Sequence, residues 1–158
     1  MNKNIIVFSL IMVTIVVLAG CKKGTVDSPM ALTAVIMVNG SDMTNGTMSN
    51  PNQDDLMTLR AEFSDPQGNH TIRMAAASYA HGHGMMNHMG EITLWDDGTH
   101  GDHEPGDGWY TMEDDMLQMM SMMGNHWNNI MGSHEFQFYC LDEDGNESNH
   151  ITAHLNVQ

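Results

Sequence analysis

The stretch 81–90 reads HGHGMMNHMG and combines three histidines and three methionines with three glycines and one asparagine. The thioether sulfur of methionine is a soft, neutral ligand that selects Cu(I), and by extension Ag(I), while imidazole also binds Cu(II), Ni(II) and Zn(II). Glycine allows a backbone to wrap closely around an ion. We therefore expect this stretch to bind copper or silver, with the candidate ligands His81, His83, Met85, Met86, His88 and Met89. The alternatives are a flexible loop without a metal and exposed methionines that scavenge oxidants as sulfoxides.

A second methionine-rich stretch, 114–132, reads DDMLQMMSMMGNHWNNIMG and lacks the alternation of a strand. Asp114 or Asp115 can cap a short helix there, and Gly124 can end it. Helical spacing puts four methionines on one face, so a second set of candidate ligands is Met116, Met119, Met120, Met123 and His126. Methionine is also an adaptable core residue, and packing of the helix explains this stripe better than metal binding does.

A third candidate site is acidic and lies in the glycine-containing stretch 95–108. Clustered carboxylates on a flexible loop suit Ca²⁺, which takes six to eight oxygen ligands. The candidate calcium ligands are Asp96, Asp97, Asp102 and Asp107. Their spacing does not match the EF-hand pattern, and a solvated turn stabilised by local Asp and Gly interactions is the favoured alternative.

Charge and motif content exclude several classes of function. After position 21 the chain keeps four basic and 20 acidic residues, a formal charge of −16, which repels nucleic acid and attracts cations. The sequence contains no glycine-rich phosphate loop, no HExxH motif and no nucleophile elbow. Cys140 alternates with Phe136 and Phe138, so we expect a buried residue and not a nucleophile. We therefore expect neither an enzyme nor a nucleic-acid partner.

The N-terminus indicates export and lipid attachment. Lys3 precedes an apolar run, 5–18, that is too short to span a bilayer comfortably and is typical of a signal peptide. The tetrapeptide LAGC that ends at Cys21 resembles a bacterial lipobox, which implies cleavage before Cys21 and lipidation of its thiol. We expect a signal peptide over 1–20, a lipidated tether over 21–29 and a membrane anchor in the cell envelope. Lys22 after the cysteine favours the outer membrane.

The elements that carry these stretches are predicted to be strands. Strict two-residue alternation of apolar and polar side chains predicts half-buried antiparallel strands at Ala31–Val38, Leu56–Phe63, His134–Leu141 and Ile151–Val157. Weaker strands are expected at His70–Tyr79, Glu91–Trp95 and Gly108–Met112. Seven short strands separated by turn signals indicate an all-β, immunoglobulin-like antiparallel β-sandwich over 30–158, with insertions at 80–90 and 113–132.

Two stretches carry a family resemblance. WDDGTHGDHEPGDGWYT, at 95–111, and GSHEFQFYCLDEDGNES, at 132–148, resemble the closing half of bacterial extracellular immunoglobulin-like domains. The resemblance implies the fold and says little about function. In composition, the stretches rich in methionine and histidine are similar to those of periplasmic copper-handling proteins.

Two functions follow as expectations. The first is a lipid-anchored envelope protein that binds or buffers copper or silver. The second is an immunoglobulin-like surface module, stiffened by Ca²⁺, that presents the methionine-rich helix to a protein partner.

Overall fold

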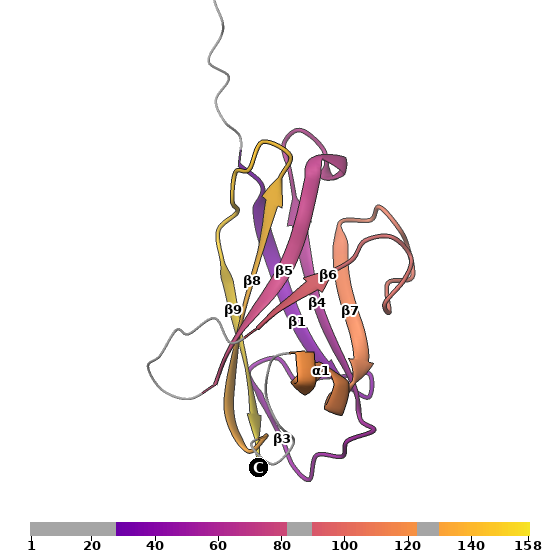
Figure 1. Cartoon of the computed structure of the whole chain (residues 1–158), viewed down its shortest axis with the longest axis vertical. Coiled ribbons are helices and arrows are strands. Elements are labelled where there is room, and N and C mark those ends of the chain that lie inside the picture. The colour runs from indigo at the N-terminus through magenta and orange to yellow at the C-terminus, as the bar shows by residue number, and fades with distance from the viewer. Residues whose placement is uncertain (1–27, 82–89, 123–129) are drawn as a thin grey trace, which may run out of the picture.

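The alternating segments pair into two facing sheets (Figure 1). This is a computed structural model, and it describes residues 28–81, 90–122 and 130–158. The four-stranded sheet has the order β2-β1-β4-β7 and the five-stranded sheet the order β3-β9-β8-β5-β6. The all-β sandwich predicted from the alternation is therefore confirmed.

The strands of the four-stranded sheet are β1 (Met30–Val38), β2 (Ser41–Asp42), β4 (Leu56–Ser64) and β7 (Trp109–Asp115). The strands of the five-stranded sheet are β3 (Gly46–Met48), β5 (Ile72–His81), β6 (Glu91–Leu94), β8 (Gly132–Asp142) and β9 (Ile151–Val157). A 3-10 turn, η1 (Asn69–Thr71), precedes β5, and one α-helix, α1 (Met116–Met122), follows β7.

The core lies between the sheets and is built from the apolar half of each alternating strand. Phe136, Phe138 and Cys140 of β8 are fully buried and face the four-stranded sheet. Burial of a side chain of that size contributes about 1.5–3 kcal/mol. Burial also raises the pKa of the Cys140 thiol to about 11, so the thiol is neutral at physiological pH. The expectation that Cys140 points inward is confirmed.

One edge of the sandwich departs from the predicted antiparallel arrangement. The sequence pair Asn45-Gly46 is a turn signal, and a turn is present: the Gly46 N–H donates to the Met43 carbonyl at 2.8 Å. The turn leads into β3, which runs parallel to β9 with Gly46 opposite Leu155. The chain crosses from β2 to the other sheet here, and Asn45 holds the crossing. Its backbone N–H donates to the carbonyl of His154 at 2.7 Å, and its side chain accepts the His154 N–H at 3.0 Å. A pairing of three residues is too short to produce a recognisable alternation.

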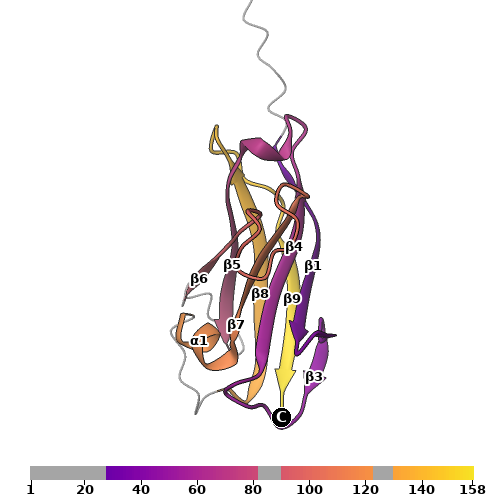
Figure 2. The same cartoon turned by 90° about the vertical axis from the view of Figure 1, so that its right-hand side faces the viewer.

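The predicted helix is present, and Asp115 is its cap. The Asp115 carboxylate accepts the N–H of Gln118 at 2.8 Å, which satisfies a donor of the first turn. β7 continues to Asp115 and α1 begins at Met116, so the insertion begins later than its predicted boundary at 113. Figure 2 shows α1 beside the lower end of the sandwich, and the described chain begins at the opposite end. The expected helix end at Gly124 lies outside the described residues.

The N-terminal expectations fall outside the part of the chain that the structure describes. These are the signal peptide at 1–20, Cys21 and nearly all of the tether. Among the described residues, no helix has the length and apolar character needed to cross a membrane.

Candidate functional site

Residues on either side of the two stretches rich in methionine and histidine lie side by side in the fold. We call 82–89 the loop segment and 123–129 the helix segment. β5 ends at His81, directly before the loop segment, and β8 begins just after the helix segment. His81 and His134 are directly opposite each other in the antiparallel β5–β8 pair. The attachment points of both segments therefore share one end of the five-stranded sheet.

Most of the proposed soft-metal ligands lie outside the described residues. These are His83, Met85, Met86, His88, Met89, Met123 and His126. His81 is placed by its backbone as the last residue of β5. Their role as ligands stays a prediction.

Three hydrogen bonds connect Tyr79, which precedes the loop segment, with residues that follow the two segments. The N–H of Tyr79 donates to the carbonyl of Gly90 at 3.2 Å, which closes the base of the loop segment. The hydroxyl of Tyr79 lies 2.7 Å from Nδ1 of His134, and Nε2 of His134 lies 2.5 Å from the carbonyl oxygen of Ile130. Tyr79, His134 and Ile130 are all buried. We call this chain of contacts the Tyr79–His134 relay.

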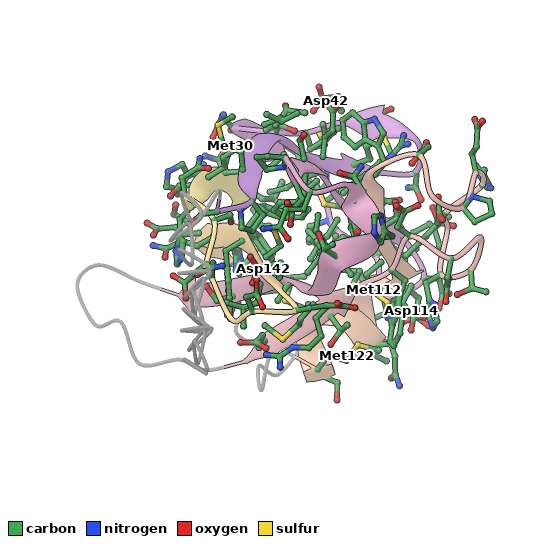
Figure 3. All side chains as sticks on the ribbon, turned by 90° about the horizontal axis from the view of Figure 1, so that it is seen from above. Met30, Asp42, Met112, Asp114, Met122 and Asp142 are labelled. Atoms are coloured by element: carbon green, nitrogen blue, oxygen red, sulfur yellow. The ribbon has the colours of Figure 1, made fainter. Side chains whose placement is uncertain are left out.

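Three of the four described methionines of α1 belong to the core. Met116, Met119 and Met120 are fully buried, in one apolar cluster with Met57 of β4 and Met112 of β7. Their burial agrees with the expectation that these methionines pack the helix onto the sandwich. Metal ligation by their thioethers stays a prediction. Met122 faces outward and is 40 % exposed. Figure 3 shows Met112 and Met122 on the same side of the sandwich.

Three of the four predicted calcium ligands come together. Carboxylate oxygens of Asp96, Asp102 and Asp107 lie within 4.8 Å of one another, and we call these residues the acidic triad. Asp97 is not a member. Adjacent residues at a strand end point in opposite directions, and Asp97 instead accepts the N–H of Thr99 at 2.9 Å. Hydrogen bonding from Thr99 lowers the pKa of Asp97.

Backbone donors hold the acidic triad in place. Asp96 accepts the N–H groups of Gly106 and Gly108 at 2.6 and 3.1 Å, and the buried Asp102 accepts that of Gly98 at 2.7 Å. Asp107 lies 3.7 Å from the Arg60 guanidinium. Each carboxylate therefore already has a hydrogen-bond or ion-pair partner within the protein.

The carboxylates of the acidic triad affect one another's titration. Burial raises the pKa of Asp96, the two backbone N–H groups lower it, and the charges of Asp102 and Asp107 raise it further. The net result is a raised pKa. Of the triad, Asp96 lines an open cavity of about 550 Å³, together with residues that include His70. A cation there would offset the repulsion among the carboxylates.

The relay is the feature that sequence patterns alone do not predict. Tyr79 and His134 lie 55 positions apart, and their contact depends on the register of β5 against β8. A usable signal was present, because His134 is a polar residue at an inward position of an otherwise apolar alternation. The arrangement places a buried tyrosine–histidine contact beside the described ends of the two segments. Any assignment of function rests on these residues, since no protein-family model and no curated protein matches the chain.

Proposed function

We propose that this chain is a lipid-anchored, non-enzymatic protein of the bacterial cell envelope that binds or buffers Cu(I) or Ag(I). The observation that carries the proposal is the adjacency of the two attachment points, with His81 opposite His134. The loop segment, which contains three methionines and two histidines, starts in that small region, and the helix segment, which contains Met123 and His126, ends there. Soft monovalent ions prefer these ligands over the carboxylates that dominate the rest of the chain.

The charge of the protein supports the same function. The chain after position 21 carries a formal charge of −16, which raises the local concentration of cations. Thioethers do not titrate, whereas imidazole gains a proton near pH 6. Cu(I) held mainly by methionine should therefore persist in mild acid, while Cu(II) held by histidine should be released.

The lipobox LAGC supports anchoring through Cys21, with the outer membrane favoured. The described chain begins at the end of the sandwich opposite α1 (Figure 1). An anchor at Cys21 would therefore hold α1 away from the bilayer.

A competition titration tests the metal function. Residues 22–158, which contain every described element, are titrated with Cu(I) against a chromophoric chelator. One variant replaces Met85, Met86, Met89, His83 and His88 by serine. The matched control replaces Met30, Met131, His100 and His103, which are exposed residues outside the two segments.

We expect tight binding by the unaltered chain, a loss of at least about tenfold in the loop variant and no change in the control. Binding no tighter than that of a weak chelator would rule the metal function out.

The acidic triad favours a second candidate, a calcium-stiffened immunoglobulin-like module that binds a protein partner. A ligand that binds only the native state raises its stability by mass action. Thermal unfolding with Ca²⁺, with Cu(I) and with a chelator separates the two candidates. A shift with Ca²⁺ that is lost in Asp102→Asn but kept in Asp144→Asn supports the calcium module. A shift with Cu(I) alone supports the first proposal.

A further inference from the structure

The outer side of α1 exposes apolar side chains beside the start of β4. Leu117 and Met122 of α1 are 42 % and 40 % exposed, and Leu56, the first residue of β4, is 42 % exposed. The N–H of Leu117 donates to the carbonyl of Gln53 at 3.2 Å, which attaches the first turn of α1 to the segment that leads into β4. We call Leu56, Leu117 and Met122 the α1 surface.

The inner side of the same helix fixes the α1 surface in place. Met116, Met119 and Met120 are fully buried in the core. The N–H of Met116 also donates to the carbonyl of Asp55 at 2.8 Å. The packing of α1 therefore does not use the exposed side chains, and a partner would meet them on a helix that is already positioned. Binding to a preformed surface costs less conformational entropy than binding to a mobile one.

Three aspartates surround the α1 surface. Asp54 is exposed and lies two residues before Leu56. Asp115 is directly opposite Leu56 in the β4–β7 pair, a position at which Cβ atoms are about 4.5–5.5 Å apart. Asp114 and Met122 lie on the same side of the sandwich, as Figure 3 shows. We call these three aspartates the acidic rim.

The two arginines of the described residues lie elsewhere. Arg60 is engaged at the other end of β7, where its guanidinium lies 3.7 Å from Asp107 and 4.2 Å from the centre of the Trp109 ring. Arg73 is the second residue of β5, next to the 3-10 turn η1. Within the part of the chain that the structure describes, the acidic rim is therefore not neutralised by lysine or arginine.

We infer that the α1 surface binds a partner protein through an apolar segment that is flanked by lysine or arginine. Exposed apolar side chains bordered by charged ones are typical of protein–protein contacts. The apolar side chains supply affinity, while the acidic rim attracts a basic partner and repels anionic lipid and nucleic acid. The inference rests on the second candidate function, a module that binds a protein partner, and it does not depend on copper binding.

A labelled helical peptide with leucine on one face and lysine on the other is the probe. One control peptide replaces each lysine by glutamate, and another replaces each leucine by serine. Binding to the mature chain is measured by fluorescence anisotropy at an ionic strength of about 0.15 M, which screens exposed charges more than about 8 Å apart. We expect the leucine–lysine peptide to bind at least about tenfold more tightly than either control peptide.

Substitutions of exposed leucines locate the binding surface. We expect Leu117→Ser to weaken binding of the leucine–lysine peptide at least about fivefold, because a few central apolar contacts dominate most interfaces. Leu56→Ser should weaken it as well, without altering α1. Leu32→Ser is the matched control, since Leu32 is 47 % exposed and lies in the part of β1 that pairs with the far end of β4. Thermal unfolding checks that each variant is folded.

A pair of charge substitutions separates the acidic rim from the net charge of the chain. Asp54→Asn and Asp144→Asn each remove one exposed negative charge, but only Asp54 belongs to the rim. We expect about two- to threefold weaker binding in Asp54→Asn and no change in Asp144→Asn. Equal losses in the two variants would show that the peptide responds to overall charge, which would overturn the inference.

Two further results would overturn it. These are equal binding of all three peptides, and equal binding by folded Leu117→Ser and Leu32→Ser. Thermal unfolding with Ca²⁺ and without peptide tests the second candidate function separately. A calcium-dependent shift without specific peptide binding would overturn the α1 surface and leave the calcium module standing. Absence of both would overturn both.

Discussion

Methionine has two different environments along the described chain. Met57, Met116 and Met119 are fully buried and fill the apolar cluster between α1 and the sheets. Met30 and Met131 are more than half exposed, at 55 % and 57 %. The flexible thioether side chain adapts to irregular gaps, which explains its use beneath a short helix. The excess of methionine therefore has a structural component as well as the proposed chemical one.

Substitution of a buried methionine by alanine should reveal that structural component. Met119→Ala removes a fully buried side chain and should lower the free energy of unfolding by about 2–5 kcal/mol. Met122→Ala, on the exposed side of the same helix, should change it by less than about 0.5 kcal/mol. Urea denaturation measures both values. Equal losses in the two variants would mean that Met119 does not pack as described.

At the scale of elements, the loop between β6 and β7 illustrates how backbone geometry holds the acidic triad. Gly101 has φ +85°, and a Cβ at this position would lie 2.5 Å from Cβ of Glu113. Gly106 has a similar φ of +80°, but a Cβ there would have no other atom within 4 Å. Alanine at position 106 would therefore introduce backbone strain alone, whereas alanine at position 101 would add a steric clash with Glu113.

Gly106→Ala should cost about 1–2 kcal/mol of stability from the left-handed backbone alone. Gly101→Ala should cost about 1–3 kcal/mol more, because the loop must also move away from β7. Thermal unfolding of the two variants measures the difference. If both lose the same stability, then the loop does not pack against Glu113 as the structure indicates.

The turn between β8 and β9 gives a pH-dependent prediction. Asp142 accepts the backbone and side-chain N–H groups of Asn146, each at 2.7 Å. Burial raises the pKa of Asp142 and these hydrogen bonds lower it, with a net decrease. A lowered pKa stabilises the fold above the unfolded value of 3.8, and this contribution is lost as the pH falls through the lower folded value.

Asp142→Asn removes that titration. Its stability should therefore fall less steeply below pH 4 than that of the unaltered chain, as measured by urea denaturation at a series of pH values. Asp144→Asn, in the same turn, serves as the control and should retain the original slope. An unchanged slope in Asp142→Asn would contradict the assigned role of the carboxylate.

Sequence patterns predicted the long elements well and the short ones poorly. Leu56–Phe63 and Ile151–Val157 were recognisable because each has one apolar and one polar face. β2 and β3 contain two and three residues, too few to establish a period. The acidic triad was predicted as a cluster of four, since spacing along the chain does not show that Asp97 turns toward Thr99. The Tyr79–His134 contact requires the strand register, which no local pattern supplies.

At the scale of the whole molecule, the start of the described chain and α1 lie at opposite ends of the sandwich. The chain enters at one end, where the lipidated tether is expected, while α1 and both attachment points lie toward the other (Figure 1). Acidic residues outnumber basic ones 20 to five across the sequence, so the surface as a whole attracts cations. This arrangement suits a protein that meets metal ions in the space beyond a membrane surface.

The central claim is that methionines of the loop segment bind a soft metal ion. The most direct test is an NMR titration of the mature chain, with ¹³C-labelled methionine methyl groups, against diamagnetic Ag(I). We predict shifts for Met85, Met86 and Met89, and none for the buried Met57. Shifts confined to the exposed Met30 and Met131, or no methionine shifts at all, would contradict the claim.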